Sequence, residues 1–303
     1  MRYFFIVAFL IFSLSGEELI TPVPDAIPHN TIKAALGKKL FMDTILSKNG
    51  KVSCNSCHRL DKGGSDNKRF STGANGKTLR NAPSIYNAVF NYRQFWDARA
   101  KDLKELITKS IECKKALNNS FENLIDSLND SNYKDEFQKI YKTPITKDKI
   151  IEVIEEYLKT LITPDSDFDR FLKGDKNALS FDQKKGYLLF KIKGCISCHN
   201  GVNAGGNLIN RFGIFKEIGG KDLGRYFVTK NEKDRYLFKV PSLRNIELTY
   251  PYFHDGRVKD LSKVVSMAKV QLGQRLQSDE VRQIVMFLKS LTSNTLKSRS
   301  KKR

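Results

Sequence analysis

The sequence predicts a mainly α-helical protein of two similar modules with long loops and little β-structure. The motif C-x-x-C-H occurs at 54–58 and again at 195–199, which indicates two units of one structural type. The segments around both motifs are rich in Gly and Asn, which favours loops. Strand-like patterns are sparse, and only 212–227 and 237–240 are β candidates.

The spacing of apolar residues predicts several helices. A G-x-x-L-F segment, at 37–41 and at 186–190, precedes each C-x-x-C-H motif on a candidate helix. Between the modules, apolar residues follow the helical period over 150–161. The second module opens with a capping box at 180–183 and closes with a helix over 279–291 that carries one apolar stripe.

The chain is expected to divide into four segments. Residues 1–16 begin with one Arg and continue as an apolar run that ends in small residues, which is typical of a cleaved secretory signal peptide. An uncleaved membrane anchor is the alternative interpretation. An N-terminal module is predicted over 17–165 and a C-terminal module over 166–292. A basic tail is predicted over 293–303, and its last stretch, 297–303, is expected to be solvated and disordered.

C-x-x-C-H is the attachment motif of c-type haem. Positions i, i+3 and i+4 share one face of a helical turn, so two cysteines can form thioethers with one porphyrin edge while the histidine presents its imidazole to the iron. The sequence therefore predicts two covalently bound haems, each held by two cysteines and one histidine: Cys54, Cys57 and His58, and Cys195, Cys198 and His199. Export agrees with this prediction, because haem is attached to exported chains.

A dithiol redox pair, a structural disulfide and half of a zinc site are the other interpretations of a C-x-x-C pair. Zinc ribbons usually place their two pairs about 15–20 residues apart, and these two motifs lie much further apart. A fifth cysteine, Cys113, is left over as a free thiol or a buried apolar residue.

The chain is strongly basic, with a formal net charge of +20 and a pI near 9.7. Lys and Arg are spread along the chain without an interleaved aromatic motif, so no nucleic-acid partner is indicated. The positive charge suits an acidic redox partner or an anionic membrane surface.

Five long blocks resemble the bacterial di-haem cytochrome c peroxidases. They are 36–58, 80–91, 95–103, 240–256 and 267–273, and the resemblance runs from about residue 30 to 291. It implies a periplasmic enzyme that reduces hydrogen peroxide to water with electrons from a small cytochrome or a copper protein. Members of this family often form homodimers, although no residue here shows one.

The resemblance places the electron-accepting haem in the C-terminal module, with Met267 as the second iron ligand opposite His199. A soft sulfur ligand stabilises ferrous iron and so suits a high reduction potential. The residues alone leave this choice open, because the helical spacing of Met267 also suits a core residue and His254 and Met286 are rival ligands.

Four more residues take roles from the resemblance. Trp96, the only tryptophan, matches a position between the haems that is implicated in electron transfer; a buried aromatic residue at a domain interface is the alternative. Asn81, Thr249 and Pro251 match residues that bind calcium between the domains, and one amide oxygen with two carbonyls suits that ion. They could equally be turn residues.

The N-terminal haem site departs from the family in its histidine. The family has a removable His just after an S-x-G, whereas here Ala74 follows 71–73. No other His lies between His58 and His199, and His29 is the only spare one near the N-terminus. We therefore expect an N-terminal haem that is open or water-ligated at rest.

The same site also departs in its acid–base residue. The family has a glutamate twenty residues after the tryptophan, and that position is Ala116 here. Glu112, four residues earlier, could move the proton that peroxide cleavage needs, or it could be an ordinary surface charge.

Three classes of function follow. A peroxidase is the first, and a di-haem electron carrier or peroxide sensor without efficient turnover is the second. The third is a di-haem oxidase that modifies a partner protein; such oxidases use a distal tyrosine at the second haem, and Met267 argues against this class.

Overall fold

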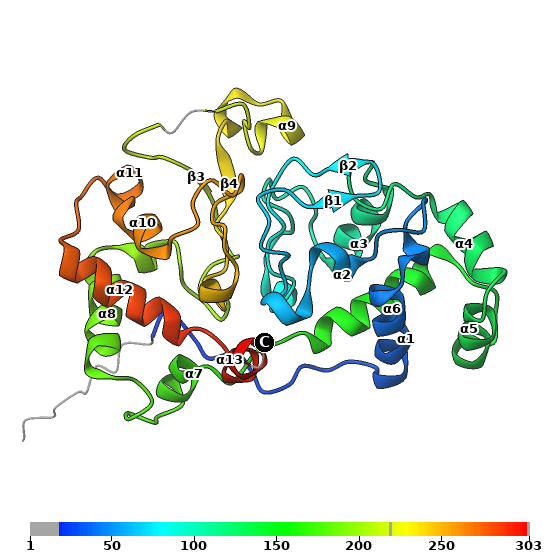
Figure 1. Ribbon diagram of the computed structural model, residues 1–303, viewed down its shortest axis with the longest axis horizontal. Helices are drawn as coiled ribbons and strands as arrows, with labels where there is room; N and C mark the ends of the chain where they lie inside the picture. Colours follow the sequence, from blue (N-terminus) through cyan, green and yellow to red (C-terminus); the bar gives the residue numbers. More distant parts are fainter. Residues whose placement is uncertain (1–17, 218–219, 302–303) are drawn as a thin grey trace, which may run out of the picture.

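The computed structural model describes residues 18–217 and 220–301, which form two modules side by side (Figure 1). The predicted signal peptide, 1–16, lies outside the described residues. Across the described ranges, no helix is long and apolar enough to cross a membrane. The fold is mainly α-helical with four very short strands in the described part, as the sequence predicts.

The N-terminal module consists of short helices around a long loop region (Figure 1). Its elements are α1 (Thr31–Met42), η1 (Thr44–Leu46), α2 (Cys54–Cys57), η2 (Leu60–Lys62), β1 (Thr72–Gly73), β2 (Gly76–Lys77), η3 (Ala88–Phe90), α3 (Leu103–Glu112), α4 (Phe121–Asn129), α5 (Tyr133–Tyr141) and α6 (Lys147–Thr160).

The C-terminal module repeats this plan with a second antiparallel pair of strands, which a long connection joins. Its elements are α7 (Asp167–Leu172), α8 (Phe181–Ile192), η4 (Cys195–Ser197), β3 (Ile209–Arg211), α9 (Tyr226–Thr229), η5 (Glu232–Asp234), β4 (Leu237–Lys239), η6 (Ile246–Leu248), α10 (Leu261–Ser266), α11 (Ala268–Leu272), α12 (Ser278–Ser290) and α13 (Asn294–Lys301). The predicted capping box is confirmed at the start of α8, where Ser180 and Gln183 exchange hydrogen bonds.

A glycine lies at the main helix crossing of each module. α1 packs against α6, and α8 packs against α12. A Cβ atom on Gly37 would lie 1.8 Å from the carbonyl oxygen of Val153, and one on Gly186 would lie 2.0 Å from that of Gln283. The repeated G-x-x-L-F segment is therefore the point where two helices approach closely. Its Leu and Phe are buried in the core beneath each crossing: Leu40, Phe41, Leu189 and Phe190.

The two modules have separate hydrophobic cores, and each core also contains one residue from the terminal segment that adjoins the other module in the sequence. The first core takes its residues from 36–161 and the second from 168–291, apart from one residue each. Ile20, which the prediction assigns to the N-terminal module, is fully buried in the second core. Leu296, from the predicted tail, is buried in the first core. These exchanged ends tie the modules together.

The prediction of a disordered tail is wrong for most of its length, because α13 occupies 294–301 at the junction of the modules (Figure 1). Asp165 caps this helix by accepting hydrogen bonds from the Ser293 hydroxyl at 2.5 Å and the Thr295 amide at 2.8 Å. The basic composition of the segment could not predict this helix, because its capping residue lies 130 residues earlier in the chain.

One of the two β candidates is confirmed. The segment 237–240 contains β4, which pairs antiparallel with β3. The candidate 212–227 is wrong, because its described residues, 212–217 and 220–227, form loop segments that lead into α9. Gly213 and Gly224 adopt positive φ angles of 86° and 63° there, which a continuous strand does not allow.

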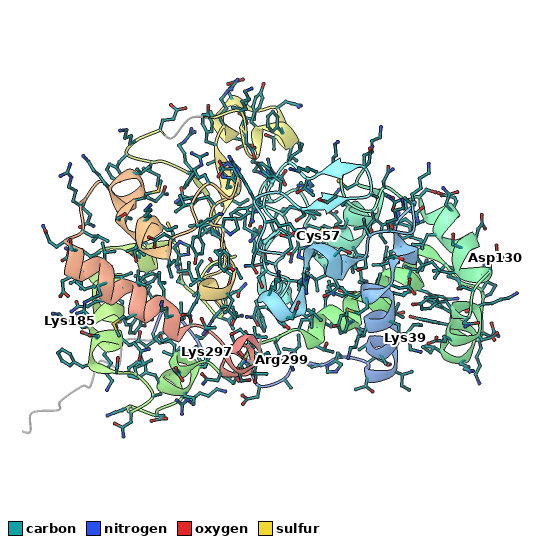
Figure 2. The ribbon with its side chains drawn as sticks, in the orientation of Figure 1. Lys39, Cys57, Asp130, Lys185, Lys297 and Arg299 are labelled. Atoms are coloured by element: carbon teal, nitrogen blue, oxygen red, sulfur yellow. The ribbon has the colours of Figure 1, made fainter. Side chains whose placement is uncertain are left out.

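The helix crossings yield a first prediction. Gly186→Ala should lower the free energy of unfolding by about 1–3 kcal/mol, because the added methyl group meets backbone that cannot move cheaply. Chemical denaturation monitored by circular dichroism measures the change. Lys185→Ala is the matched control on the exposed side of α8 (Figure 2), and it should unfold close to wild type. Equal stability of the two variants would contradict the close approach.

Candidate functional site

The first C-x-x-C-H motif is presented by α2, which follows α1 in the N-terminal module. Ser53 and Ser56 cap this single turn reciprocally. His58 follows the turn, and its Nδ1 lies 3.1 Å from the carbonyl oxygen of Pro83. An Nδ1–H that donates to a backbone carbonyl leaves Nε2 as the free ligand atom of the ring. This arrangement suits an iron ligand.

The second motif lies on η4, directly after α8. His199 is half-buried, and its buried Nδ1 atom has no hydrogen-bond partner of good geometry among the described residues. A Cβ on Gly205 would lie 3.2 Å from this Nδ1 and 2.3 Å from the carbonyl oxygen of Pro241. Gly205 and Pro241 therefore form a close cradle on one side of the ring, and a larger residue than glycine would fill it.

The protonation states of both motifs suit haem attachment. Burial lowers the pKa of His199 to about 4 and also lowers the pKa of His58, which favours the neutral imidazole that a metal ligand requires. Burial raises the pKa of the Cys54 thiol to about 12 and that of Cys195 to about 11. A catalytic dithiol needs a lowered pKa instead, which argues against the redox-pair interpretation.

The disulfide and zinc interpretations also lose support. All five cysteines are free thiols in the structure, including both members of each motif. In the part of the chain that the structure describes, no group of three or more His, Cys, Asp or Glu residues could hold a metal ion. Two thiols and one neutral imidazole on each turn fit a covalent haem with an axial histidine.

Met267 lies between α10 and α11 and is half-buried. Its segment is tied to the second motif through β3, because Gln271 donates to the carbonyl oxygen of Arg211 at 3.0 Å while Asn210 donates to the sulfur of Cys198 at 3.3 Å. The rival Met286 faces Arg282, whose guanidinium lies 3.5 Å from its sulfur on the exposed side of α12. The position of Met267 is therefore compatible with an iron ligand near His199.

Trp96 lies at the junction of the two modules. Its indole nitrogen donates to the carbonyl oxygen of Asn81 at 2.9 Å, and its carbonyl oxygen accepts from the amide of Lys239 at 2.7 Å. Its ring centroid is 6.3 Å from that of His254, which is stacked on Phe238 at 4.1 Å. The rival ligand His254 is therefore part of an aromatic cluster that includes Trp96.

A buried ionic network surrounds this aromatic cluster. The guanidinium of Arg80 contacts Asp97 at 2.6 Å and binds both oxygens of Asp222, at 2.6 and 2.8 Å. Arg80 and Asp97 belong to the N-terminal module and Asp222 to the C-terminal one. Burial alone would raise the pKa of Asp222, but Arg80 outweighs it and holds this pKa below its usual value. Sequence reasoning missed this network, because the partners are 142 residues apart.

The three predicted calcium ligands come from both modules and lie around one shared backbone contact. Asn81 donates its amide hydrogen to the carbonyl oxygen of His254 at 2.8 Å, three residues after Pro251. The side-chain nitrogen of Asn81 donates to the carbonyl oxygen of Lys68 at 2.8 Å, which leaves its Oδ1 available as a ligand. Asn67 donates to the carbonyl oxygens of Leu248 and Tyr250, on either side of Thr249, at 2.8 Å each.

A further residue of this region, Asp66, was not found by sequence reasoning. It is only 3% exposed, and its Oδ2 has no hydrogen-bond partner in the described ranges. The next two residues contact both parts of the predicted calcium site: Asn67 donates to the carbonyl oxygen of Leu248, next to Thr249, and the carbonyl oxygen of Lys68 accepts from Asn81. A buried carboxylate oxygen without a partner is costly unless a cation offsets it. The G-G-S-D turn gave no signal of this burial.

The two departures from the family lie side by side. The amide of Ala74 donates to the carbonyl oxygen of Ala116 at 2.7 Å, and a Cβ on Gly73 would lie 2.1 Å from the carbonyl oxygen of Lys115. The positions where the family has its removable His and its glutamate are therefore adjacent, and both have a methyl group here.

The remaining candidates lie at the surface. Glu112 ends α3 with its side chain 49% exposed, and its carboxylate is 3.5 Å from Lys147. His29 is exposed and close to the carbonyl oxygen of Ile27, at 2.9 Å. Cys113, next to Glu112, is half-buried.

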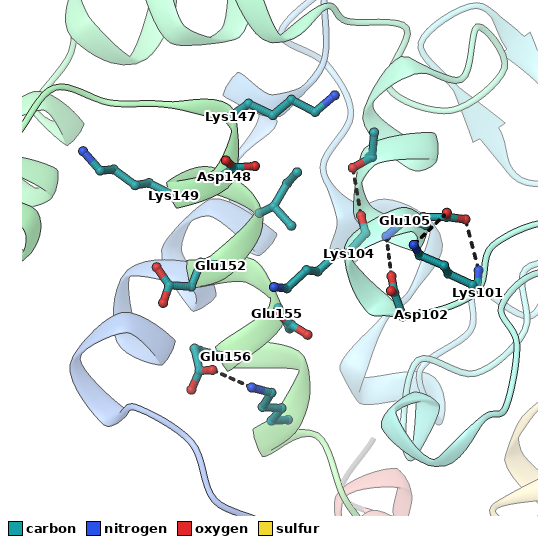
Figure 3. A pocket seen from close by; sticks show the side chains of 13 residues that line it. Lys101, Asp102, Lys104, Glu105, Lys147, Asp148, Lys149, Glu152, Glu155 and Glu156 are labelled. Carbon is teal, nitrogen blue, oxygen red and sulfur yellow. Dashed lines mark hydrogen bonds and ion pairs between the residues drawn. The ribbon is translucent and has the colours of Figure 1, made fainter.

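A separate cavity of about 650 Å³ lies between α3 and α6 (Figure 3). Its walls carry alternating charges, such as Lys104, Glu105 and Glu155. None of the haem-motif residues lines it, so this cavity is distinct from the haem sites.

Two helical modules that each present a C-x-x-C-H turn, joined through a tryptophan, define a di-haem c-type cytochrome. The profile of the di-haem cytochrome c peroxidases matches residues 31–177. The chain is 45% identical to a cytochrome c551 peroxidase of Nitrosomonas europaea, over 93% of this chain and 86% of that protein. It is 41% identical to a cytochrome c551 peroxidase of Pseudomonas aeruginosa, over 91% and 85% of the two chains.

The chain therefore belongs to the di-haem cytochrome c peroxidase family, a family of oxidoreductases. Its fold is similar to the crystal structure of a MauG-like protein associated with microbial copper homeostasis, with a TM-score of 0.80 and 24% identity. That similarity covers 95% of this chain and 98% of the other, and it shows the shared fold alone.

The ionic network yields a second prediction. Arg80→Gln should lower the free energy of unfolding by about 3–5 kcal/mol, because it leaves buried carboxylates without a counter-charge. Denaturant titration of the purified protein measures this. Arg282→Gln is the matched control, since Arg282 also bridges two aspartates but is 52% exposed, and it should stay close to wild type. If both variants lose the same stability, the network does not join the modules.

Proposed function

We propose that this protein is a periplasmic peroxidase that reduces hydrogen peroxide to water with electrons from a small cytochrome or a copper protein. The observation that carries the proposal is the pair of half-buried C-x-x-C-H turns, one in each of the two modules that meet at Trp96. Two haems c bound there would supply an electron store and a site for peroxide reduction. The net charge of +20 suits an acidic electron donor.

The roles of the chain's own residues follow from their positions. His58 and His199 would each present a neutral Nε2 to iron, and Met267 would be the second ligand in the C-terminal module. Trp96 would lie between the two sites, where its indole is held by Asn81 of its own module and its backbone carbonyl accepts from Lys239 of the other. We also expect export through a cleaved signal peptide at 1–16, and a homodimer is compatible with this function.

Peroxide cleavage needs a group that moves a proton between the two oxygens. Glu112 is the carboxylate nearest in sequence to the position of the family's glutamate, but its ion pair with Lys147 directs it to the surface. The carboxylate of Glu112 would have to break its ion pair with Lys147 to reach the position where Ala74 and Ala116 are in contact. The adjacent methyl groups of these two residues favour the second candidate function, a di-haem electron carrier or peroxide sensor with little turnover.

Steady-state turnover of peroxide with a reduced donor cytochrome tests the function directly. If Glu112 is the acid–base group, Glu112→Gln should lower kcat by about 10²–10⁴ with unchanged haem spectra. Ala116→Glu should raise kcat, because it restores a carboxylate beside Ala74. Glu122→Gln, at an exposed position on α4, is the control and should have no effect. Turnover by Ala116→Glu alone, with none by wild type, would establish the carrier or sensor.

Cyanide binding tests the open N-terminal site. The fully oxidised protein should bind cyanide at the haem of His58, because Ala74 cannot ligate iron, and this is visible in the Soret band. Ala74→His should suppress binding until the other haem is reduced, whereas Ala74→Leu adds bulk without a ligand. A wild-type protein that is low-spin and inert to cyanide would indicate another ligand, with His29 the first to examine.

We propose in addition that calcium binds between the modules at Asn81, Thr249 and Pro251. The free Oδ1 of Asn81 and the two carbonyls are suitable hard ligands, and the buried Asp66 would supply negative charge through ordered water. This carboxylate is the observation that favours a cation over simple turn residues.

Calcium should therefore raise the melting temperature of chelator-treated protein, because it binds the native state alone. Asp66→Asn should weaken calcium binding by roughly 10–100-fold, as loss of an outer-sphere partner does. Asp130→Asn, at an exposed position after α4, is the control. A melting temperature that calcium leaves unchanged would show that the three residues only form turns.

A further inference from the structure

Lys239 occupies the centre of the junction between the modules. It is the last residue of β4, whose other edge pairs with β3. Its backbone amide donates to the carbonyl oxygen of Trp96 at 2.7 Å. Two residues later, the carbonyl oxygen of Pro241 lies in the cradle of His199. On the neighbouring strand, Asn210 donates to the sulfur of Cys198.

The side chain of Lys239 is buried and has no anionic partner among the described residues. Only 7% of the residue is exposed. Burial lowers its pKa to about 8, and no carboxylate opposes this shift. The acidic residues of the junction, Asp97 and Asp222, are already paired with Arg80. A buried ammonium group is costly unless an anion pairs with it.

The two haems of the proposed function would bring the missing anions, because each haem carries two propionates. Lys239 is the buried cation at the contact with Trp96, and its strand pair touches both Cys198 and the cradle of His199. We propose that Lys239 is the counter-ion of a haem propionate at the module junction. This inference rests on the two haems of the proposed function, and it assigns a role to a residue that neither ligates iron nor contacts peroxide.

A positive charge beside a haem stabilises the reduced iron relative to the oxidised iron, because reduction removes one positive charge. Lys239→Gln should therefore lower the reduction potential of one haem, with a roughly tenfold smaller equilibrium constant for reduction. Lys239→Arg keeps the charge and should restore the wild-type potential. Lys233→Gln is the matched control, because it removes the same charge from an exposed position on η5.

Spectroelectrochemical titration of the purified holoprotein measures both potentials, and resonance Raman spectroscopy follows the propionate bending band. We expect Lys239→Gln to shift this band and the potential of the same haem, and the identity of that haem tells whose propionate is bound. A potential and a band that match wild type would overturn the proposal. If Lys239→Gln does not fold, the band in Lys239→Arg decides, since a guanidinium must change the propionate hydrogen bond.

The haem content of each preparation separates this inference from the proposed function. A wild-type protein without two haems would contradict the proposed function itself. A protein with two haems, in which Lys239→Gln and Lys233→Gln have equal potentials, would contradict only the role of Lys239.

Discussion

The contact between the modules is the constraint on which the rest of the structure depends. Arg80 crosses this contact and binds Asp222 with two hydrogen bonds, while Asp97 holds its remaining nitrogen. The same contact includes Trp96 and His254, whose rings lie 6.3 Å apart. Electron transfer between two sites depends on a constant separation, and the ionic network together with the exchanged chain ends provides it.

Each module presents one C-x-x-C-H turn, the attachment motif of a haem. A glycine lets two helices cross closely, and the C-x-x-C-H turn follows the first of these helices, after a connecting segment with η1 in the N-terminal module and almost at once in the C-terminal one. The two sites then differ through their loops. The second has Met267 between two short helices, in a segment tied to β3, whereas the first has Ala74 and Ala116 in contact. One scaffold thus carries different residues at its two sites.

The features that depend on residues close together in the chain could be predicted from the sequence. The capping box of Ser180, the helices and the haem motifs depend on residues within one or two turns of each other. The Arg80–Asp222 pair, the burial of Asp66 and the cap that Asp165 gives to α13 depend on partners far apart in the chain, which no local pattern reveals. The adjacency of Ala74 and Ala116 is of the same kind. The roles of Met267, Glu112 and the calcium ligands remain predictions.

Pulse radiolysis tests the central claim, that one contact joins two redox sites within a single chain. A single electron is introduced into the fully oxidised holoprotein, and the absorbance of both haems is followed over a range of protein concentrations. We expect the electron to redistribute between the haems at a rate that does not depend on concentration. A rate that rises in proportion to protein concentration would show exchange between molecules and would contradict the claim.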